Sequence, residues 1–370
     1  MTTSVIPAVR EQTPRPVEKK LRLRGFTSAA AWSLAGSAAG ALGLTWLLYE
    51  QVLPLSGALG FWLCWYVAFL GFYAVVTLLT AGNRQVVTDR LVAVVVTSAG
   101  IVVLAIVGNQ IGYTLYRGWA ALGHLGNFLT QTMAQAGPLD PLSVGGVLHA
   151  VVGSLEQMGI ATVVSVPLGF LAALFLAEVD NPLSRSVRAI VEAMTALPEI
   201  IAGLFVYAMV ILTFGVRQSG LAASIALTVM MIPFVIRSAE VMLRLVPGTL
   251  REASLALGAS RLRTAWLVVL PTARSGLTTA VVLGMARAIG ETAPVLITAG
   301  FTPFLNADPT SGPQTSLPLY IFSYVKEPQA TMISRAFGAG LVLMFLVLVL
   351  FAVARAFGGR GPGRRGRSGR

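Results

Sequence analysis

Residues 251–271 read REASLALGASRLRTAWLVVLP, a basic and partly apolar stretch between two long apolar runs. Small side chains recur in its first half, at Ala253, Ser254, Ala256 and Ala259. A helix over 249–257 would therefore have one thin side, which suits entry into a groove on a partner. A connection that only joined two membrane spans would not need such a helix. The stretch predicts a membrane protein whose connecting segment contacts another subunit.

The whole connection 238–275 has repeating apolar residues with arginines between them, which is typical of short amphipathic helices lying against a membrane. The first helix is expected at 249–257 and ends at Gly258, whose backbone can turn left-handed. The second is expected to begin near Ser260 and to stop by Pro271.

The composition around this connection is that of a membrane protein. Hydrophobic residues make up 55% of the chain and charged residues 11%, against about 25% charged in soluble domains. A bilayer core needs about 20 apolar residues of helix. Eight stretches qualify: 27–49, 58–80, 91–115, 147–178, 199–216, 219–236, 276–299 and 336–356. We expect an all-α polytopic membrane protein with about eight transmembrane helices, in which the long run 147–178 is tilted or protrudes.

The net charge of +12 is sorted along the chain. With the N-terminus inside, the cytoplasmic basic residues are Arg10, Arg15, Lys19, Lys20, Arg22, Arg24, Arg84, Arg90, Arg185, Arg188, Arg237, Arg244, Arg251, Arg261, Arg263, Arg274 and those of the tail after Arg355. Only Arg117, Arg217, Lys326 and Arg335 fall outside. This asymmetry places both termini in the cytoplasm. The basic tails, 1–26 and 357–370, are expected to set topology and touch anionic membrane lipids rather than nucleic acid.

Residues for catalysis or cofactor binding are missing. The three lysines stand in no glycine-rich loop of the kind that cradles nucleotide phosphates. His124 and His149 have no ligand at metal-binding spacing, and Cys64 is the only cysteine. We expect neither an enzyme nor a chain that binds ATP, a metal or another cofactor itself.

The connection 251–271 resembles the EAA loop of ABC-importer permeases, whose form is EAA, three residues, G, nine residues, then I, one residue and LP. Ser254 replaces the second alanine and Val268 the isoleucine. In that family the first helix docks in a cleft of the cytoplasmic ATPase. The resemblance implies that the residues coupling this chain to the ATPase are Glu252, Ala253, Ser254, Leu257 and Gly258.

Four further stretches are similar to the permeases of phosphate-specific ABC importers, which belong to the type I ABC importer permease family. They are 151–181, 195–209 (TALPEIIAGLFVYAM), 286–294 (ARAIGETAP) and 316–324 (SLPLYIFSY). The resemblance covers roughly 86–356 and implies a six-helix permease core there, preceded by two extra helices over 27–80. Small residues at 35–43 suit close packing of that extra pair. Glu199 departs from the family pattern, which has a small polar residue after the proline.

Arg287 and Glu291 lie in the otherwise apolar run 276–299. A charge at the centre of a spanning helix costs about 2.5–3.5 kcal/mol, so it needs an offsetting interaction. At i and i+4 the two side chains can meet on one helix face, either as a packing pair or as a waystation for an anion. Guanidinium engages two oxygens of an oxyanion at once, which favours the pathway interpretation.

Two more residues are candidates for the substrate pathway. Thr292 adds a hydroxyl beside the charged pair, and the following Pro294 removes a helix hydrogen bond and can bend the helix there. Arg237, at the inner end of its span, is either a second anion contact or a topology charge.

The resemblance implies an importer that passes inorganic phosphate into the cytoplasm across the bacterial plasma (inner) membrane. The implied partners are one homologous permease subunit (PstC), two ATPase subunits (PstB) that use the ATP, and an extracytoplasmic phosphate-binding protein (PstS). Three alternatives stay open: a permease for sulfate or molybdate, a phosphate-sensing subunit that transports nothing, and a free-standing channel. The coupling connection argues against the channel.

Overall fold

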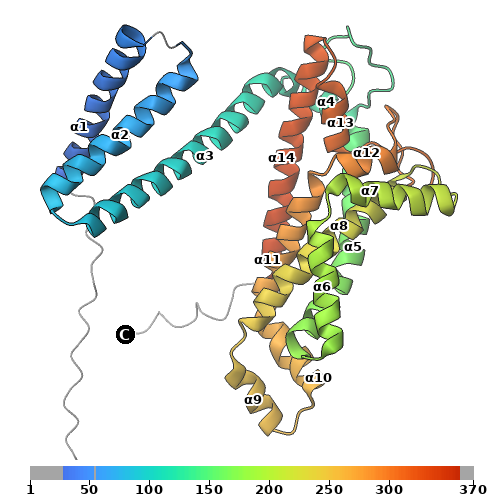
Figure 1. Cartoon of the computed structure of the whole chain (residues 1–370). Helices are drawn as coiled ribbons and strands as arrows, with labels where there is room; N and C mark the ends of the chain where they lie inside the picture. Colours follow the sequence, from blue (N-terminus) through green and yellow to red (C-terminus); the bar gives the residue numbers. More distant parts are fainter. Residues whose placement is uncertain (1–27, 54–55, 359–370) are drawn as a thin grey trace, which may run out of the picture. The chain divides into compact units, whose positions relative to one another are not determined.

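The computed structural model describes residues 28–53 and 56–358, and every regular element in these ranges is helical (Figure 1). The basic tail predicted at 1–26, and residues 359–370 of the tail predicted at 357–370, lie outside the described residues. Seven helices are long and apolar enough to cross a membrane, or up to eight if one bent pair is counted as a span. The prediction of an all-α polytopic membrane protein with about eight spans is confirmed.

The chain forms two compact units, Met1–Val107 and Gly108–Arg370. The helices that begin in the first unit are α1 (Ser28–Trp46), its π-helical continuation η1 (Leu47–Val52), α2 (Ala58–Ala81) and α3 (Arg84–Leu122), the last of which runs on into the second unit. Small residues bring α1 and α2 close together. Ala41 is fully buried, and the indole Nε1 of Trp65 donates to the carbonyl oxygen of Ala38 at 3.1 Å.

The second unit holds the remaining helices. They are α4 (Leu125–Thr130), α5 (Leu148–Glu178), α6 (Pro182–Ala196), α7 (Glu199–Val206) with η2 (Tyr207–Thr213), α8 (Gly220–Arg244), α9 (Gly248–Ala256), α10 (Arg261–Thr264) with η3 (Ala265–Val269), α11 (Leu270–Ile289), α12 (Ala293–Ala299), α13 (Leu317–Tyr324) and α14 (Ala330–Gly358). Within this unit α9 and α10 lie at one end, and α4 and α13 lie at the other (Figure 1).

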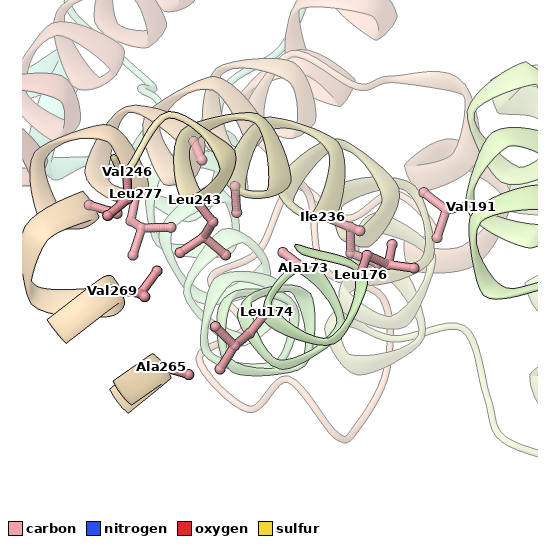
Figure 2. Packing of buried hydrophobic residues seen from close by; sticks show 13 residues of the cluster. Ala173, Leu174, Leu176, Val191, Ile236, Leu243, Val246, Ala265, Val269 and Leu277 are labelled. Carbon is pink, nitrogen blue, oxygen red and sulfur yellow. The ribbon is translucent and has the colours of Figure 1, made fainter. Parts of the chain in front are cut away.

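The core of the second unit lies between α5, α8 and α11. Val235 of α8 fits between two glycines: a Cβ on Gly169 of α5 would lie 2.6 Å from it, and one on Gly284 of α11 would lie 2.8 Å from it. Towards the α9 end, buried Leu176, Leu243 and other apolar side chains fill the space between these helices (Figure 2). Backbones that approach this closely make a rigid three-helix frame, because dispersion contacts are dense.

One predicted span takes a different form. The run 199–216 is not an independent straight helix but the second arm of a pair, α6 and α7 with η2, bent by 105°. The break falls at Leu197 and Pro198, whose ψ angles are 131° and 137°. A residue before proline avoids the helical region, so α6 ends there. The bend brings Glu199 to the start of the second arm.

The connection 238–275 also differs from prediction. Its first residues extend α8 to Arg244, past the predicted end at 236. The second amphipathic helix does not stop by Pro271, because α10, η3 and α11 continue as one candidate span over Arg261–Ile289. Pro271 lies just after the π-helical segment η3, and the helix continues past it.

Two long connections between the expected spans, 116–146 and 300–335, contain regular structure. At 116–146, α3 continues to Leu122 and α4 follows. In the connection 300–335, Gln314 is 1% exposed and α13 begins with a buried Leu317. The Nε2 of Gln157 donates to the carbonyl oxygen of Gln314 at 3.1 Å, and the Nε2 of Gln314 donates to the Glu156 carboxylate. This connection is therefore partly packed into the helix bundle.

Candidate functional site

Arg287 lies in the last turn of α11, directly before a break in the helix. α11 ends at Ile289, and α12 begins only at Ala293, so the single span predicted at 276–299 is wrong. Pro294 in the first turn of α12 explains the restart, because proline cannot donate to a continuous helix. Glu291 lies in the break rather than on the helix face of Arg287.

The nearest carboxylate to Arg287 is that of Glu199, the first residue of α7, which accepts a hydrogen bond from Nη2. The Nε of Arg287 is 3.9 Å from Oε1 of Glu291, too long for a hydrogen bond. The Arg287 guanidinium carbon lies 5.0 Å from the centre of the Phe234 ring, within cation–π range. The predicted pair with Glu291 is thus the weaker contact, and Glu199 is the principal partner.

Two small cavities flank the break. One, of about 30 Å³, is lined by Arg287, Glu199, Phe234, Thr195 and apolar neighbours. The other, of about 10 Å³, is lined by Glu291 together with polar Ser154, Gln157 and Ser316. Both volumes are on the scale of water molecules rather than of a tetrahedral oxyanion. An anion entering here has to displace side chains.

The other predicted pathway residues are placed differently. Thr292 is half-buried in the same break, next to Glu291. Arg237 does not line either cavity; its Nη2 lies 2.9 Å from the carboxylate of Glu192 on α6, and both side chains are about half exposed. The break therefore brings together Arg287, Glu291 and Thr292, and leaves Arg237 outside the group.

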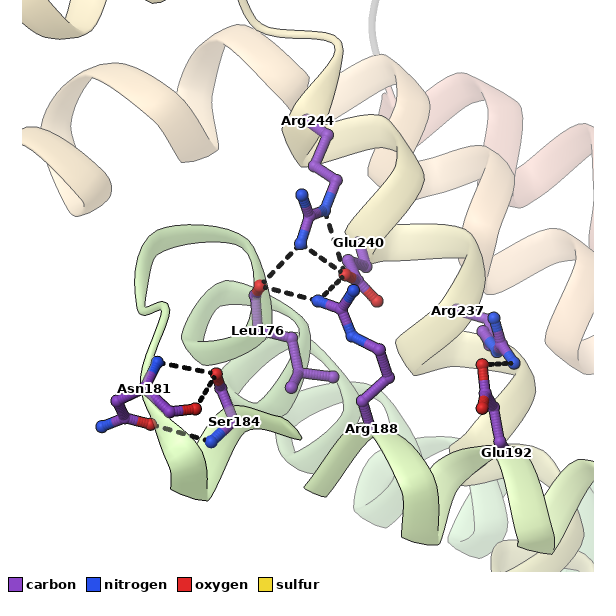
Figure 3. A network of polar contacts seen from close by, with 8 residues as sticks. All are labelled: Leu176, Asn181, Ser184, Arg188, Glu192, Arg237, Glu240 and Arg244. Atoms are coloured by element: carbon purple, nitrogen blue, oxygen red, sulfur yellow. Dashed lines mark hydrogen bonds and ion pairs between the residues drawn. The ribbon is translucent and has the colours of Figure 1, made fainter. Parts of the chain in front are cut away.

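A network of arginines fastens the end of the bundle near α9 (Figure 3). Glu240 of α8 accepts from Arg188 of α6 at 2.8 Å and from Arg244 of α8 at 3.0 Å. Both arginines also donate to the carbonyl oxygen of Leu176 on α5. One carboxylate and one carbonyl thus tie three helices together.

The predicted coupling helix is anchored at the same end of the bundle by contacts of its own. α9 covers Gly248–Ala256, close to the predicted 249–257, and Gly258 has the expected left-handed φ of 85°. Arg251 anchors it by donating to Glu178 at 3.1 Å and to the carbonyl oxygens of Leu243 and Val246. The Oγ of Ser254 lies 2.9 Å from Oγ1 of Thr264, which joins α9 to α10.

The other predicted coupling residues face away from the bundle. Glu252 and Ala253 are exposed, and Leu257 is 89% exposed. No residue of α9 is buried. The helix is thus held from one side and open on the other, the arrangement that a docking helix requires.

Arg335, predicted as an outer topology charge, is instead fully buried in α14. Its Nη2 donates to the carbonyl oxygens of Asp140, Pro141 and Val144 at 2.9–3.0 Å. It therefore holds the connection before α5 in place. Sequence reasoning missed this role, and it also missed the role of Glu199, although the unusual glutamate after Pro198 was a visible signal.

Two further findings concern charged groups away from the helix break. Across the described ranges, no three His, Cys, Asp or Glu side chains are grouped closely enough to hold a metal ion. In the connection 300–335, hydrogen bonds from the side chain and backbone of Thr310, and from Ser311, lower the pKa of the exposed Asp308 carboxyl. The Asp308 carboxylate thus stabilises the turn that it forms with Thr310 and Ser311.

Comparison with known proteins places these features in context. The sequence model of the family described as "Binding-protein-dependent transport system inner membrane component" matches residues 165–360. The phosphate transport system permease protein PstA 1 of Mycobacterium tuberculosis (strain CDC 1551 / Oshkosh) is 40% identical over 235 residues, which are 63% of this chain and 76% of that protein.

A second relative is more distant. The phosphate transport system permease protein PstA of Pasteurella multocida (strain Pm70) is 34% identical over 219 residues, 59% of this chain and 78% of that protein. Among solved structures, the MetNI methionine ABC transporter in an inward-facing conformation has a TM-score of 0.45 and 23% identity, over 58% of this chain and 94% of that chain.

Proposed function

Because this chain belongs to the family of binding-protein-dependent transport system inner membrane components, we propose that it is the permease subunit of an ATP-driven phosphate importer. The observation that carries the choice of phosphate is the 40% identity to PstA 1 over 76% of that protein. The family is multi-pass in the inner membrane, and its members are transport subunits that are not themselves ATPases.

The site supports an oxyanion as the substrate. Arg287 uses one of its five donors on Glu199, and it lines a cavity instead of being enclosed by helices. Guanidinium matches the paired oxygens of phosphate, and the helix break supplies the Thr292 hydroxyl nearby. Glu291 keeps the local charge from holding the anion too tightly, since a transporter must also release it.

The opposite end of the unit supports coupling to an ATPase. α9 is anchored through Arg251 and presents Glu252, Ala253 and Leu257 outward. We assign these residues, with Ser254 and Gly258, to the contact with the partner ATPase. The complete assembly is then this chain, a homologous permease PstC, two copies of PstB and the binding protein PstS, with both termini of this chain in the cytoplasm.

Uptake of labelled phosphate by the complete importer in proteoliposomes tests the function. We expect ATP-dependent phosphate accumulation that excess unlabelled phosphate abolishes and that equal excesses of sulfate or molybdate leave largely intact. If sulfate or molybdate competed as strongly as unlabelled phosphate, the substrate would be assigned as another oxyanion. Undiminished uptake by vesicles lacking this chain would instead make it a subunit without a transport role.

A further inference from the structure

The ion pair between Arg287 and Glu199 is not enclosed by the rest of the chain. The two side chains are 43% and 39% exposed, although both residues lie in apolar helices. Exposed ion pairs contribute little net stability because water competes for both partners. A pair of this kind exchanges partners readily, in contrast to Glu291, which is 8% exposed.

The Glu199 carboxylate takes the position that an incoming oxyanion needs. A carboxylate presents two oxygens to a guanidinium, in the same planar geometry as two oxygens of phosphate. The adjoining cavity, of about 30 Å³, is smaller than a phosphate ion, so the carboxylate occupies the side of the guanidinium on which phosphate would enter this cavity. Phosphate and Glu199 therefore compete for Arg287.

The element that carries Glu199 is connected to both functional regions. α7 packs closely on α12: a Cβ on Gly203 would lie 2.6 Å from the Cα of Pro294, just beyond the helix break. Across the bend, α6 is tied to α8 by the contact of Arg188 with Glu240. A shift of α6 relative to α8 would thus move the Glu199 carboxylate with respect to Arg287.

We propose that Glu199 is a resident counter-anion of the transport site, which phosphate displaces on entry and which returns to Arg287 when phosphate leaves. The inference rests on the proposed function. Glu199 is then a positioning and specificity residue that lowers the affinity of the site for phosphate and speeds release. The apparent affinity for phosphate is reduced because the guanidinium is available only for the fraction of time in which the carboxylate does not occupy it.

Binding of inorganic phosphate tests this directly. The importer is purified with its ATPase and partner permease but without binding protein or ATP, and labelled phosphate is measured by equilibrium dialysis. We expect Glu199→Gln to bind phosphate several-fold more tightly than the parent, because the competing charge is removed. Single-turnover release of phosphate should slow in proportion.

The matched control is Asp180→Asn, which removes one negative charge from an exposed residue between α5 and α6 and should leave the affinity unchanged. Glu199→Ser provides a second variant without a carboxylate in case the glutamine variant assembles poorly. Arg287→Gln should remove binding both alone and combined with Glu199→Gln.

If both Glu199 variants bind phosphate with the affinity of the parent and only lose thermal stability, Glu199 is a structural ion-pair partner and the inference is wrong. This failure differs from that of the proposed function. In the latter case the parent importer itself neither binds nor accumulates phosphate, while in the former it does both.

Discussion

Arg244 and Arg287 have similarly exposed side chains, 51% and 43%, but their surroundings differ. Arg244 shares the Glu240 carboxylate and the Leu176 carbonyl with a second arginine, so each acceptor holds two donors. Arg287 has one hydrogen-bonded carboxylate, a ring face and a cavity. Exposure therefore does not distinguish a fastening arginine, which holds helices together as Arg244 does, from a binding arginine such as Arg287. They differ in the number of acceptors around the guanidinium and in the space beside it.

The largest expected effect comes from removing the binding arginine. Arg287→Ala should lower phosphate uptake by the reconstituted importer at least a thousandfold, or about 4 kcal/mol, because no other donor in the break offers a charged fork. Assembly and thermal stability should stay near those of the parent, since the pair with Glu199 is half exposed.

The control for this change is Arg185→Ala, at an exposed arginine of α6 whose side chain has no ion-pair partner in the described part of the chain. It should transport like the parent. Parent-like uptake by Arg287→Ala would place the anion route elsewhere and remove the distinction between the two arginines.

A buried fastening arginine should affect stability instead. Arg335→Met leaves the carbonyls of Asp140, Pro141 and Val144 without their donor, and we expect a loss of about 3 kcal/mol in unfolding free energy. Denaturation in mild detergent measures this loss. Arg335→Lys keeps a charge and three donors and should lose less; equal losses for both variants would contradict the carbonyl-holding role.

Local signals in the sequence predicted much of the fold. Hydropathy located most of the spans, and small residues followed by Gly258 predicted α9 to within a residue, because both signals depend on neighbours in the chain. The helix break after Arg287 was only partly anticipated. Pro294 signalled a bend, but a full interruption at Gly290–Thr292 depends on packing against α7.

Contacts between residues far apart in the chain could not be predicted from the sequence. Glu199 and Arg287 are separated by 88 positions, and no periodicity relates them. The helical pattern at i and i+4 pointed to Glu291, because that rule assumes an unbroken helix. Arg335 was taken as a surface charge, since its burial depends on how the connection before α5 folds over α14.

Removing a shared acceptor should have an intermediate effect. Glu240→Gln weakens the contacts of Arg188 and Arg244 at once, but both arginines can turn to water, so we expect a loss of about 1–2 kcal/mol in unfolding free energy. Phosphate affinity, measured by the same dialysis, should change far less than in Glu199→Gln, because the carboxylate that competes with phosphate is still present. A change in affinity like that expected for Glu199→Gln would show that the two carboxylates do not have separate roles.

The smallest effect is expected at the end of the coupling helix. Gly258 has a φ of 85° with open space around it, so Gly258→Ala meets no clash and only the strain of a left-handed backbone, about 1 kcal/mol. Gly248, at the start of the same helix, also has open space but lacks a positive φ, which makes Gly248→Ala the matched control. The strained variant should hydrolyse more ATP per phosphate transported, because α9 is set at a different angle to the ATPase while Arg251 still anchors it. Equal ratios for the two alanine variants would mean that the turn at Gly258 does not orient the docking face, and that the contacts of Arg251 position α9 without it.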